Sequence, residues 1–345
     1  MKKSLKMGLF SMALIPCVAF GFAGCAGGEQ LISSKDFTQK VSEVSRTYFG
    51  SEAFESYGDR TVNYSGSEVE AYASEFTYKK NASDTQTVTE YLTQSYENVG
   101  EMIISRSGKG ENTKFKIVNN FTTLSSEYSV NLDETLKQTI TKEEAVTTYY
   151  IGMVSSVPAG ASEAVKTYYI VKEYSVVKTV DGVKGEPVVT KNYETLADAN
   201  AFKEVIEDLS LQLNSSLDAS YFTVGNSMLS VLSPVYTKNG DEYKISVEIN
   251  NASNEISSSD SYHNFMSSKV DISFKGDKLG KVEASSKMKG FGLMGDEGEA
   301  QFTMDTEIDV EYSADEIVIP AVTDYVESSI DTSDLIDFQV NISMM

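Results

Sequence analysis

The chain has few residues that could act as a catalytic base. His263 is the only histidine, and it lies in the Ser-rich segment SSSDSYHNF. A Ser–His–acid site needs a histidine held between a nucleophile and a carboxylate, and residues adjacent in sequence rarely reach that geometry. A Ser-rich segment is also typical of an exposed loop. We therefore expect no catalytic role for His263.

A glycine motif that could bind phosphate occurs at residues 290–295, where GFGLMG has the spacing G-x-G-x-x-G. In a dinucleotide site this motif follows a strand and begins a helix. Here the residues that follow alternate as a strand does, and an acidic pair comes directly after the motif. We expect a glycine-rich loop. Its Phe291, Leu293 and Met294 either cover a cavity or touch lipid, or they form a plain connection between strands.

Metal and cofactor chemistry has little support in the sequence. One histidine and two cysteines are too few for a typical zinc site, and no D-x-D-x-D-G calcium loop occurs. The 51 acidic residues offer many carboxylate pairs, but the absence of tryptophan removes the usual stacking surface for sugars. We predict no metal, no cofactor and no enzymatic activity.

The N-terminus has the parts of a secretory signal. Lysines at positions 2, 3 and 6 precede a mostly apolar run from Met7 to Ala23. The run contains Pro16 and Cys17 and is rich in Gly and Ala. It would make a poor permanent span, because a transmembrane helix needs about 20 good apolar residues.

The end of this run resembles the lipobox of bacterial lipoproteins. Ala23 and Gly24 directly precede Cys25, although Phe22 stands where the family usually has an aliphatic residue. The resemblance implies that residues 1–24 are removed and that Cys25 carries diacylglycerol and acyl chains such as palmitate, with residues 25–34 as a lipidated tether. The protein would then lie on the outer face of the bacterial cytoplasmic membrane or the cell surface. An ordinary secretory signal with a chance cysteine is the alternative.

The charge of the chain excludes some partners. Its formal net charge is −22, and loss of three lysines with residues 1–24 would leave 26 basic and 51 acidic side chains. Nucleic acid binding needs clustered Lys and Arg, so we expect no nucleic acid partner. The net charge also argues against docking on an anionic bilayer through the protein surface. We expect a partner membrane to be held through Cys25 alone.

Hydrophobic periodicity predicts a mainly β-rich domain over 35–329, followed by a tail over 330–345. Apolar residues recur at helical spacing over 34–48 and again over 195–217, where Thr195 could cap the helix. Most of the remaining segments alternate with period two, which indicates strands with one buried face. Asp181-Gly182 is a hairpin turn pair. The domain is either one unit or two similar α+β units divided near 194.

The succession of strands and turns in the last 80 residues resembles that of LolA-like lipoprotein carriers of the LppX and LprG type. In those carriers a curved sheet wraps over helices and leaves an apolar cavity. A strand ends in KGDKLG at 275–280, and a long alternating strand ending EIDVEYS precedes DEIVIP. The resemblance implies an α+β fold with a strongly curved antiparallel half-barrel packed on a few α-helices. It also implies a role in binding or carrying a lipid or other apolar ligand.

Apolar residues of helix 195–217 and of the last third are the expected lining of such a cavity. These are Phe202, Ile206, Leu209, Phe274, Met288, Phe291, Met294 and Met304. Flexible methionines suit a plastic apolar pocket, but the same residues would equally form an ordinary packed core. In the second case the protein is a structural or adhesive surface lipoprotein without a ligand.

Overall fold

The computed structural model describes residues 28–40, 59–216, 235–240, 242–250, 265–275, 278–291, 299–332 and 335. Its helices are a helical turn at 34–40, α3 (Ala199–Ser216) and the short 3₁₀ helices η1 (Gly110–Asn112) and η4 (Val322–Asp324). Its strands are β1 (Gln30–Leu31), β2 (Arg60–Tyr78), β3 (Val88–Ser107), β4 (Lys114–Val130), β5 (Leu136–Ser156), β6 (Val165–Val180), β7 (Val183–Lys184), β8 (Val188–Leu196), β9 (Val235–Asn239), β10 (Glu242–Asn250), β11 (Phe265–Lys275), β12 (Lys278–Phe291), β13 (Glu299–Glu311) and β14 (Val326–Glu327).

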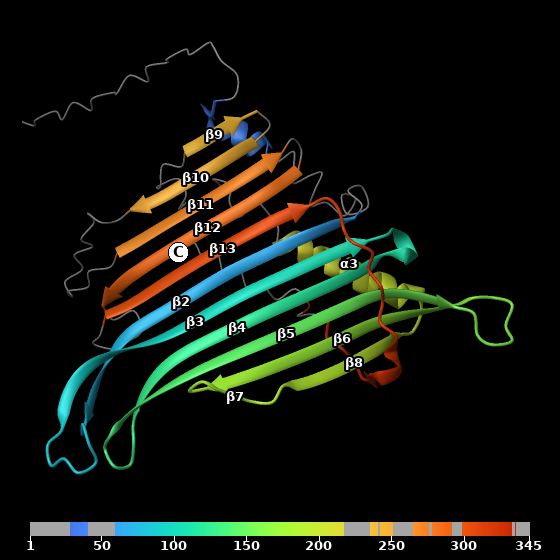
Figure 1. Ribbon diagram of the computed structural model, residues 1–345. Helices are drawn as coiled ribbons and strands as arrows, with labels where there is room; N and C mark the ends of the chain where they lie inside the picture. Colours follow the sequence, from blue (N-terminus) through green and yellow to red (C-terminus); the bar gives the residue numbers. More distant parts are fainter. Residues whose placement is uncertain are drawn as a thin grey trace, which may run out of the picture.

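All these strands belong to one 14-stranded sheet, which Figure 1 shows as a twisted layer. The strand order is β1-β9-β10-β11-β12-β13-β2-β3-β4-β5-β6-β8-β14, with β7 paired to β6. Neighbouring strands are antiparallel except β14, which runs parallel to β8. Two meanders therefore meet where β13 pairs with β2, and this seam joins segments more than 200 residues apart in sequence.

The predicted α+β fold, a LolA-like half-barrel packed on a few helices, is wrong. The structure is dominated by a single large sheet, in which β13 pairs directly with β2. Several strands span 16 to 21 residues, and β5 and β6 are examples. Hairpins whose strands alternate polar and apolar residues are common to many β-rich folds. Their succession along the chain therefore did not specify this topology. The prediction of an antiparallel sheet is confirmed.

The core lies on one face of the sheet, which we call the core face. Alternate residues of the central strands point there, including the fully buried Tyr64, Ile104 and Ile117. Helix α3 covers this face and lies behind the sheet in Figure 1. Phe37 of the turn at 34–40 joins the same cluster. Burial of these aromatic and branched side chains is the main force that holds helix to sheet.

The other face of the sheet, which we call the groove face, carries mostly polar residues and is crossed by residues 313–332. We call this segment the strap; Figure 1 shows it in front of the sheet after β13. Ile317 and Ile319 of the strap are buried against Val171 of β6. The segment then forms β14 beside β8, and Ile330 and Leu335 are buried in the core cluster. The region expected to be a tail from residue 330 therefore contains core side chains.

Candidate functional site

Four of the residues predicted to line an apolar cavity belong to the core cluster on the core face of the sheet. Phe202 and Leu209 of α3 and Phe274 of β11 are almost fully buried, and Ile206 packs against the same cluster. The Phe202 ring contacts Tyr168 of β6 with a centroid distance of 5.0 Å. At the other end of the cluster, Phe37 contacts Phe274 at 6.0 Å. These contacts are those of a packed core.

The other predicted lining residues lie outside this contact or outside the described residues. The backbone of Met288 and Phe291 belongs to β12, where they pair with Phe302 and Glu299 of β13. Met304 pairs with Ser286 across the same two strands. Met294, Cys25 and His263 lie outside the residues that the structure describes. Lipidation at Cys25 and ligand binding at all these residues therefore stay predictions.

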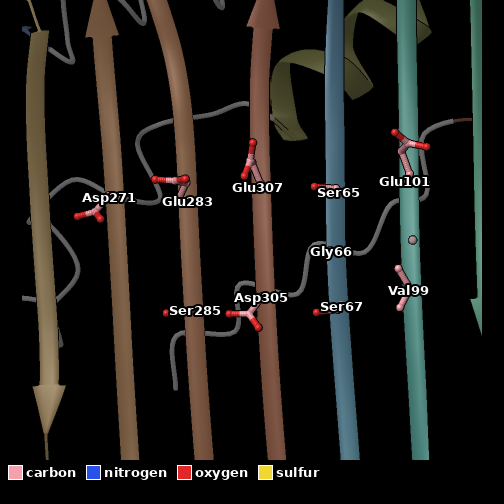
Figure 2. A pocket seen from close by; sticks show the side chains of 11 residues that line it. Ser65, Gly66, Ser67, Val99, Glu101, Asp271, Glu283, Ser285, Asp305 and Glu307 are labelled. Atoms are coloured by element: carbon pink, nitrogen blue, oxygen red, sulfur yellow. The ribbon is translucent and has the colours of Figure 1, made fainter.

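A groove of about 690 Å³ lies on the groove face. Its lining comes from β11, β12, β13, β2 and β3, as Figure 2 shows. The lining residues are small or acidic: Ser65, Gly66, Ser67, Val99, Gly100, Glu101, Asp271, Glu283, Ser285, Asp305 and Glu307. Sequence reasoning missed this groove entirely.

The hollow follows from the small residues of β2. Tyr64 of this strand points to the core, and the next three residues, Ser65, Gly66 and Ser67, add almost no bulk to the groove face. The flanking strands carry longer side chains, namely Asp305 and Glu307 on β13 and others on β3. A strand of small residues between strands of larger ones leaves a trough.

The groove concentrates negative charge by register. Asp271 lies directly opposite Glu283, and Glu283 lies directly opposite Glu307. Figure 2 shows these three in one row with Ser65 and Glu101. Like charges at directly opposite positions destabilise a sheet. The row therefore needs compensating positive charge to be stable.

Lys281 supplies part of that charge. Its Nζ lies 2.6 Å from Oε1 of Glu283 and 3.2 Å from Oε1 of Glu307. Hydrogen bonds to Glu283 and Glu307 raise the pKa of Lys281 above its ordinary value. All three side chains are partly exposed, so solvent weakens these ion pairs.

Within the described part of the chain, no group of three or more His, Cys, Asp or Glu side chains is arranged to hold a metal ion. The same part contains no helix that is both long and apolar enough to cross a membrane. The arrangement can hold positively charged groups by electrostatic attraction, and its serines can donate or accept hydrogen bonds.

Comparison with known proteins gives no family. No protein-family model and no curated protein matches the sequence. Among solved structures, the translocator domain of autotransporter NalP from Neisseria meningitidis aligns over 80% of this chain and 95% of its own, at 9% identity and a TM-score of 0.17. OprB of Pseudomonas putida aligns over 76% and 97%, at 7% identity and a TM-score of 0.14. Scores this low support no assignment of fold or function.

Proposed function

We propose that the protein is a lipid-anchored surface protein without enzymatic activity, in which a packed sheet-and-helix body displays an open polar sheet face. In this reading it is structural or adhesive, and it binds partners on its surface rather than carrying a ligand inside. The observation that carries the proposal is the packed contact between α3 and the sheet. Phe202 and Leu209 fill the place where a carrier would hold an acyl chain.

The proposal of a lipid anchor is based on the N-terminal sequence. Cys25 follows an apolar run and two small residues, and it is the only cysteine after residue 17. No cysteine partner is left for a disulfide after removal of residues 1–24. Two or more acyl chains on one sulfur and its neighbouring amine would give stable membrane attachment, whereas one chain gives only reversible binding. An anchor of this kind would hold the body at a membrane surface on the outer side.

The anchor is tested by exchanging each of the two cysteines in the full chain. Cys25→Ser should abolish incorporation of a palmitate analogue and move the protein from the membrane fraction to the medium or the soluble fraction. Cys17→Ser is the matched control, because Cys17 is expected to leave with the signal. If Cys25→Ser protein keeps both the label and its membrane association, the anchor proposal is wrong.

The absence of an internal ligand is tested separately. We expect organic extracts of the purified chain, analysed by mass spectrometry, to contain no apolar compound in stoichiometric amount besides the covalently attached lipid. A lipid that co-purifies at about one molecule per chain, and that is lost in Phe202→Ala but kept in Lys203→Ala, would restore the carrier hypothesis. Lys203 lies beside Phe202 on α3 with its side chain exposed.

A further inference from the structure

Exposed apolar side chains gather on one part of the groove face, where β2 to β5 run from the groove toward the β2–β3 and β4–β5 turns. In Figure 1 these turns lie at the lower left, at the far end of the strands from the strap. Seven large apolar side chains of β3, β4 and β5 are exposed, and all but Phe121 lie on the groove face by register. We call these six the outer patch: Tyr91, Val99, Leu124, Val130, Ile140 and Val146.

The register places Leu124 at the centre of the outer patch. Leu124 lies directly opposite Glu97 of β3 and Lys142 of β5, and residues at directly opposite positions share a face. Because side chains alternate between the two faces, Val99 and Ile140, each two residues from those positions, lie on the same face. Val99 also lines the groove, which identifies this face. The three aliphatic side chains therefore form a diagonal line across β3, β4 and β5.

The extent of this part of the groove face fits a protein interface. Four strands about 4.8 Å apart, over about ten residues at about 3.4 Å each, give a face of about 650 Å². Two such faces packed together would bury about 1,300 Å², within the range of about 1,200–2,000 Å² that stable interfaces bury. Exposed apolar patches of several hundred Å² are rare on proteins that act as monomers, and they often mark interaction sites.

The charges around the outer patch limit what can cover it. Between the groove and the turns, the groove face of β2 to β5 carries four carboxylates and one ammonium group, on Glu75, Glu97, Glu101, Glu144 and Lys142. The carboxylates would repel an anionic membrane surface, and their burial in lipid would cost free energy. On this face β4 carries no charged side chain between residues 120 and 130. A suitable partner is therefore apolar at its centre and carries a cation opposite Glu97. A second copy of the chain has both properties.

We propose that two copies of the chain pack face to face through the outer patch, related by a two-fold axis that runs along β4. In this arrangement Leu124 of one copy meets Leu124 of the other, and β3 of each copy lies over β5 of the other. The two sheets then pack as in a β-sandwich, about 10 Å apart. The inference goes beyond the proposed function, because it names a second copy of the chain as the partner.

The axis along β4 also brings opposite charges together. Glu97 and Lys142 lie on either side of Leu124, at the same level of the ladder. Each Glu97 therefore faces Lys142 of the second copy, and this contact occurs twice in the dimer. Within its own chain, Nζ of Lys142 lies 2.7 Å from Oε1 of Glu144, so the lysine would lie between two carboxylates. A self-complementary surface of this kind is what a two-fold dimer requires.

The test measures the mass of the full chain in solution by sedimentation equilibrium. Cys25→Ser is used throughout, so that association through acyl chains cannot imitate the contact and the outcome does not depend on the anchor. We expect twice the mass of one chain at micromolar concentration, because interfaces of this area have micromolar or higher affinity. Added salt should favour the dimer, since it screens the repulsion between two acidic chains and does not weaken the apolar contact.

Substitutions make the test specific to the outer patch. Leu124→Asp should raise the dissociation constant of the dimer about ten-fold or more, since it places a carboxylate at the centre of the interface. Val318→Asp, on the strap and 66% exposed, is the matched control and should leave the dissociation constant unchanged. Glu97→Lys should also weaken the dimer. Adding Lys142→Glu to Glu97→Lys should restore it, because the exchanged charges again face each other across the axis.

Several outcomes would overturn the dimer. A chain that keeps the mass of one copy up to about 0.1 mM contradicts it, and so does a dimer that Leu124→Asp leaves intact. If Lys142→Glu does not restore association in the Glu97→Lys chain, the axis along β4 is wrong. If the chain stays a single copy but binds neutral vesicles, and Leu124→Asp abolishes that binding, the outer patch takes lipid and not a second copy.

Discussion

The rings of Tyr168 and Phe202 meet across the boundary between β6 and α3, with centroids 5.0 Å apart and planes inclined by 31°. Both rings are largely removed from solvent. This pair connects the helix to the half of the sheet that contains β2 to β8, and it occupies space that a carrier of apolar ligands would leave open. The change in the free energy of unfolding when this contact is removed can therefore distinguish a filled core from a cavity.

We predict that Phe202→Ala lowers the free energy of unfolding by about 3–5 kcal/mol, because the truncation removes buried apolar surface and leaves a cavity. Urea unfolding of the full chain measures this loss. Lys203→Ala, whose side chain is 73% exposed, should change the stability by no more than about 0.5 kcal/mol. Equal effects of the two substitutions would show that residue 202 does not occupy a packed core.

A second prediction concerns the fit between β5 and the strap. A Cβ atom at Gly152 would lie 2.8 Å from Cδ1 of Ile319 and 3.0 Å from Cγ of Lys114. Gly152→Ala should therefore destabilise the protein by about 1–3 kcal/mol through overpacking. In an Ile319→Ala background the same change should cost clearly less, because the closest of these contacts is gone while the one with Lys114 remains. Gly28→Ala, with no atom within 4 Å, is the control in thermal unfolding.

A tyrosine of the strap leads us to predict that the stability of the protein depends on pH. Burial, followed by a hydrogen bond from the Tyr325 hydroxyl to Glu173, raises the pKa of Tyr325 above its usual value of 10.0. The native state then holds this proton more tightly than the unfolded state does. The resulting stabilisation is complete below about pH 10 and is lost as the pH rises through the raised pKa.

We therefore expect the free energy of unfolding to fall less steeply above pH 10 in Tyr325→Phe than in the parent protein. Denaturant unfolding at a series of alkaline pH values measures the difference in slope. Tyr91→Phe, at a position that is 54% exposed, serves as the comparison. An unchanged slope in Tyr325→Phe would mean that the hydroxyl does not hold its proton in the way the geometry indicates.

A further prediction concerns salt. Lys281→Gln removes the cation that bridges Glu283 and Glu307 and so increases the repulsion within the carboxylate row. We expect a loss of up to about 1 kcal/mol at low ionic strength. At 1 M salt the loss should shrink, because the screening length falls to about 3 Å. Lys287→Gln, also on β12, controls for removal of one lysine. A loss that persists unchanged in high salt would point to packing rather than charge.

The local elements followed from the sequence better than their assembly did. The helix expected over 195–217 is α3 at Ala199–Ser216, and the Asp181-Gly182 turn has positive φ at both residues, 50° and 80°. Thr195, expected to cap the helix, instead continues the β6–β8 ladder. Asp198 caps the helix, with its Oδ1 accepting from the backbone N–H groups of Asn200 and Ala201 at 2.8 and 3.0 Å. A residue's local preference cannot show which of two adjacent elements will use it.

The groove could not be predicted in the same way. Its row of carboxylates comes from β11, β12, β13 and β3, and it exists only because the registers place Asp271, Glu283 and Glu307 opposite one another. A shift of one residue in any of these pairings would move a side chain to the other face. The sequence shows the alternation within each strand, but the pairing of β13 with β2 across more than 200 residues is set by the whole fold.

The strand order has a mechanical consequence. If the chain is held at its N-terminus while a partner pulls on the β8 edge, the load runs across the sheet, along the direction of the interstrand hydrogen bonds. In that direction bonds break one strand at a time rather than all together. The first strand to detach would be β1, whose pairing with β9 covers Gln30 and Leu31 and continues in one backbone hydrogen bond from Ile32 to Tyr236. A small force would thus release a tether of extra length while the central strands, with their long ladders, stay intact.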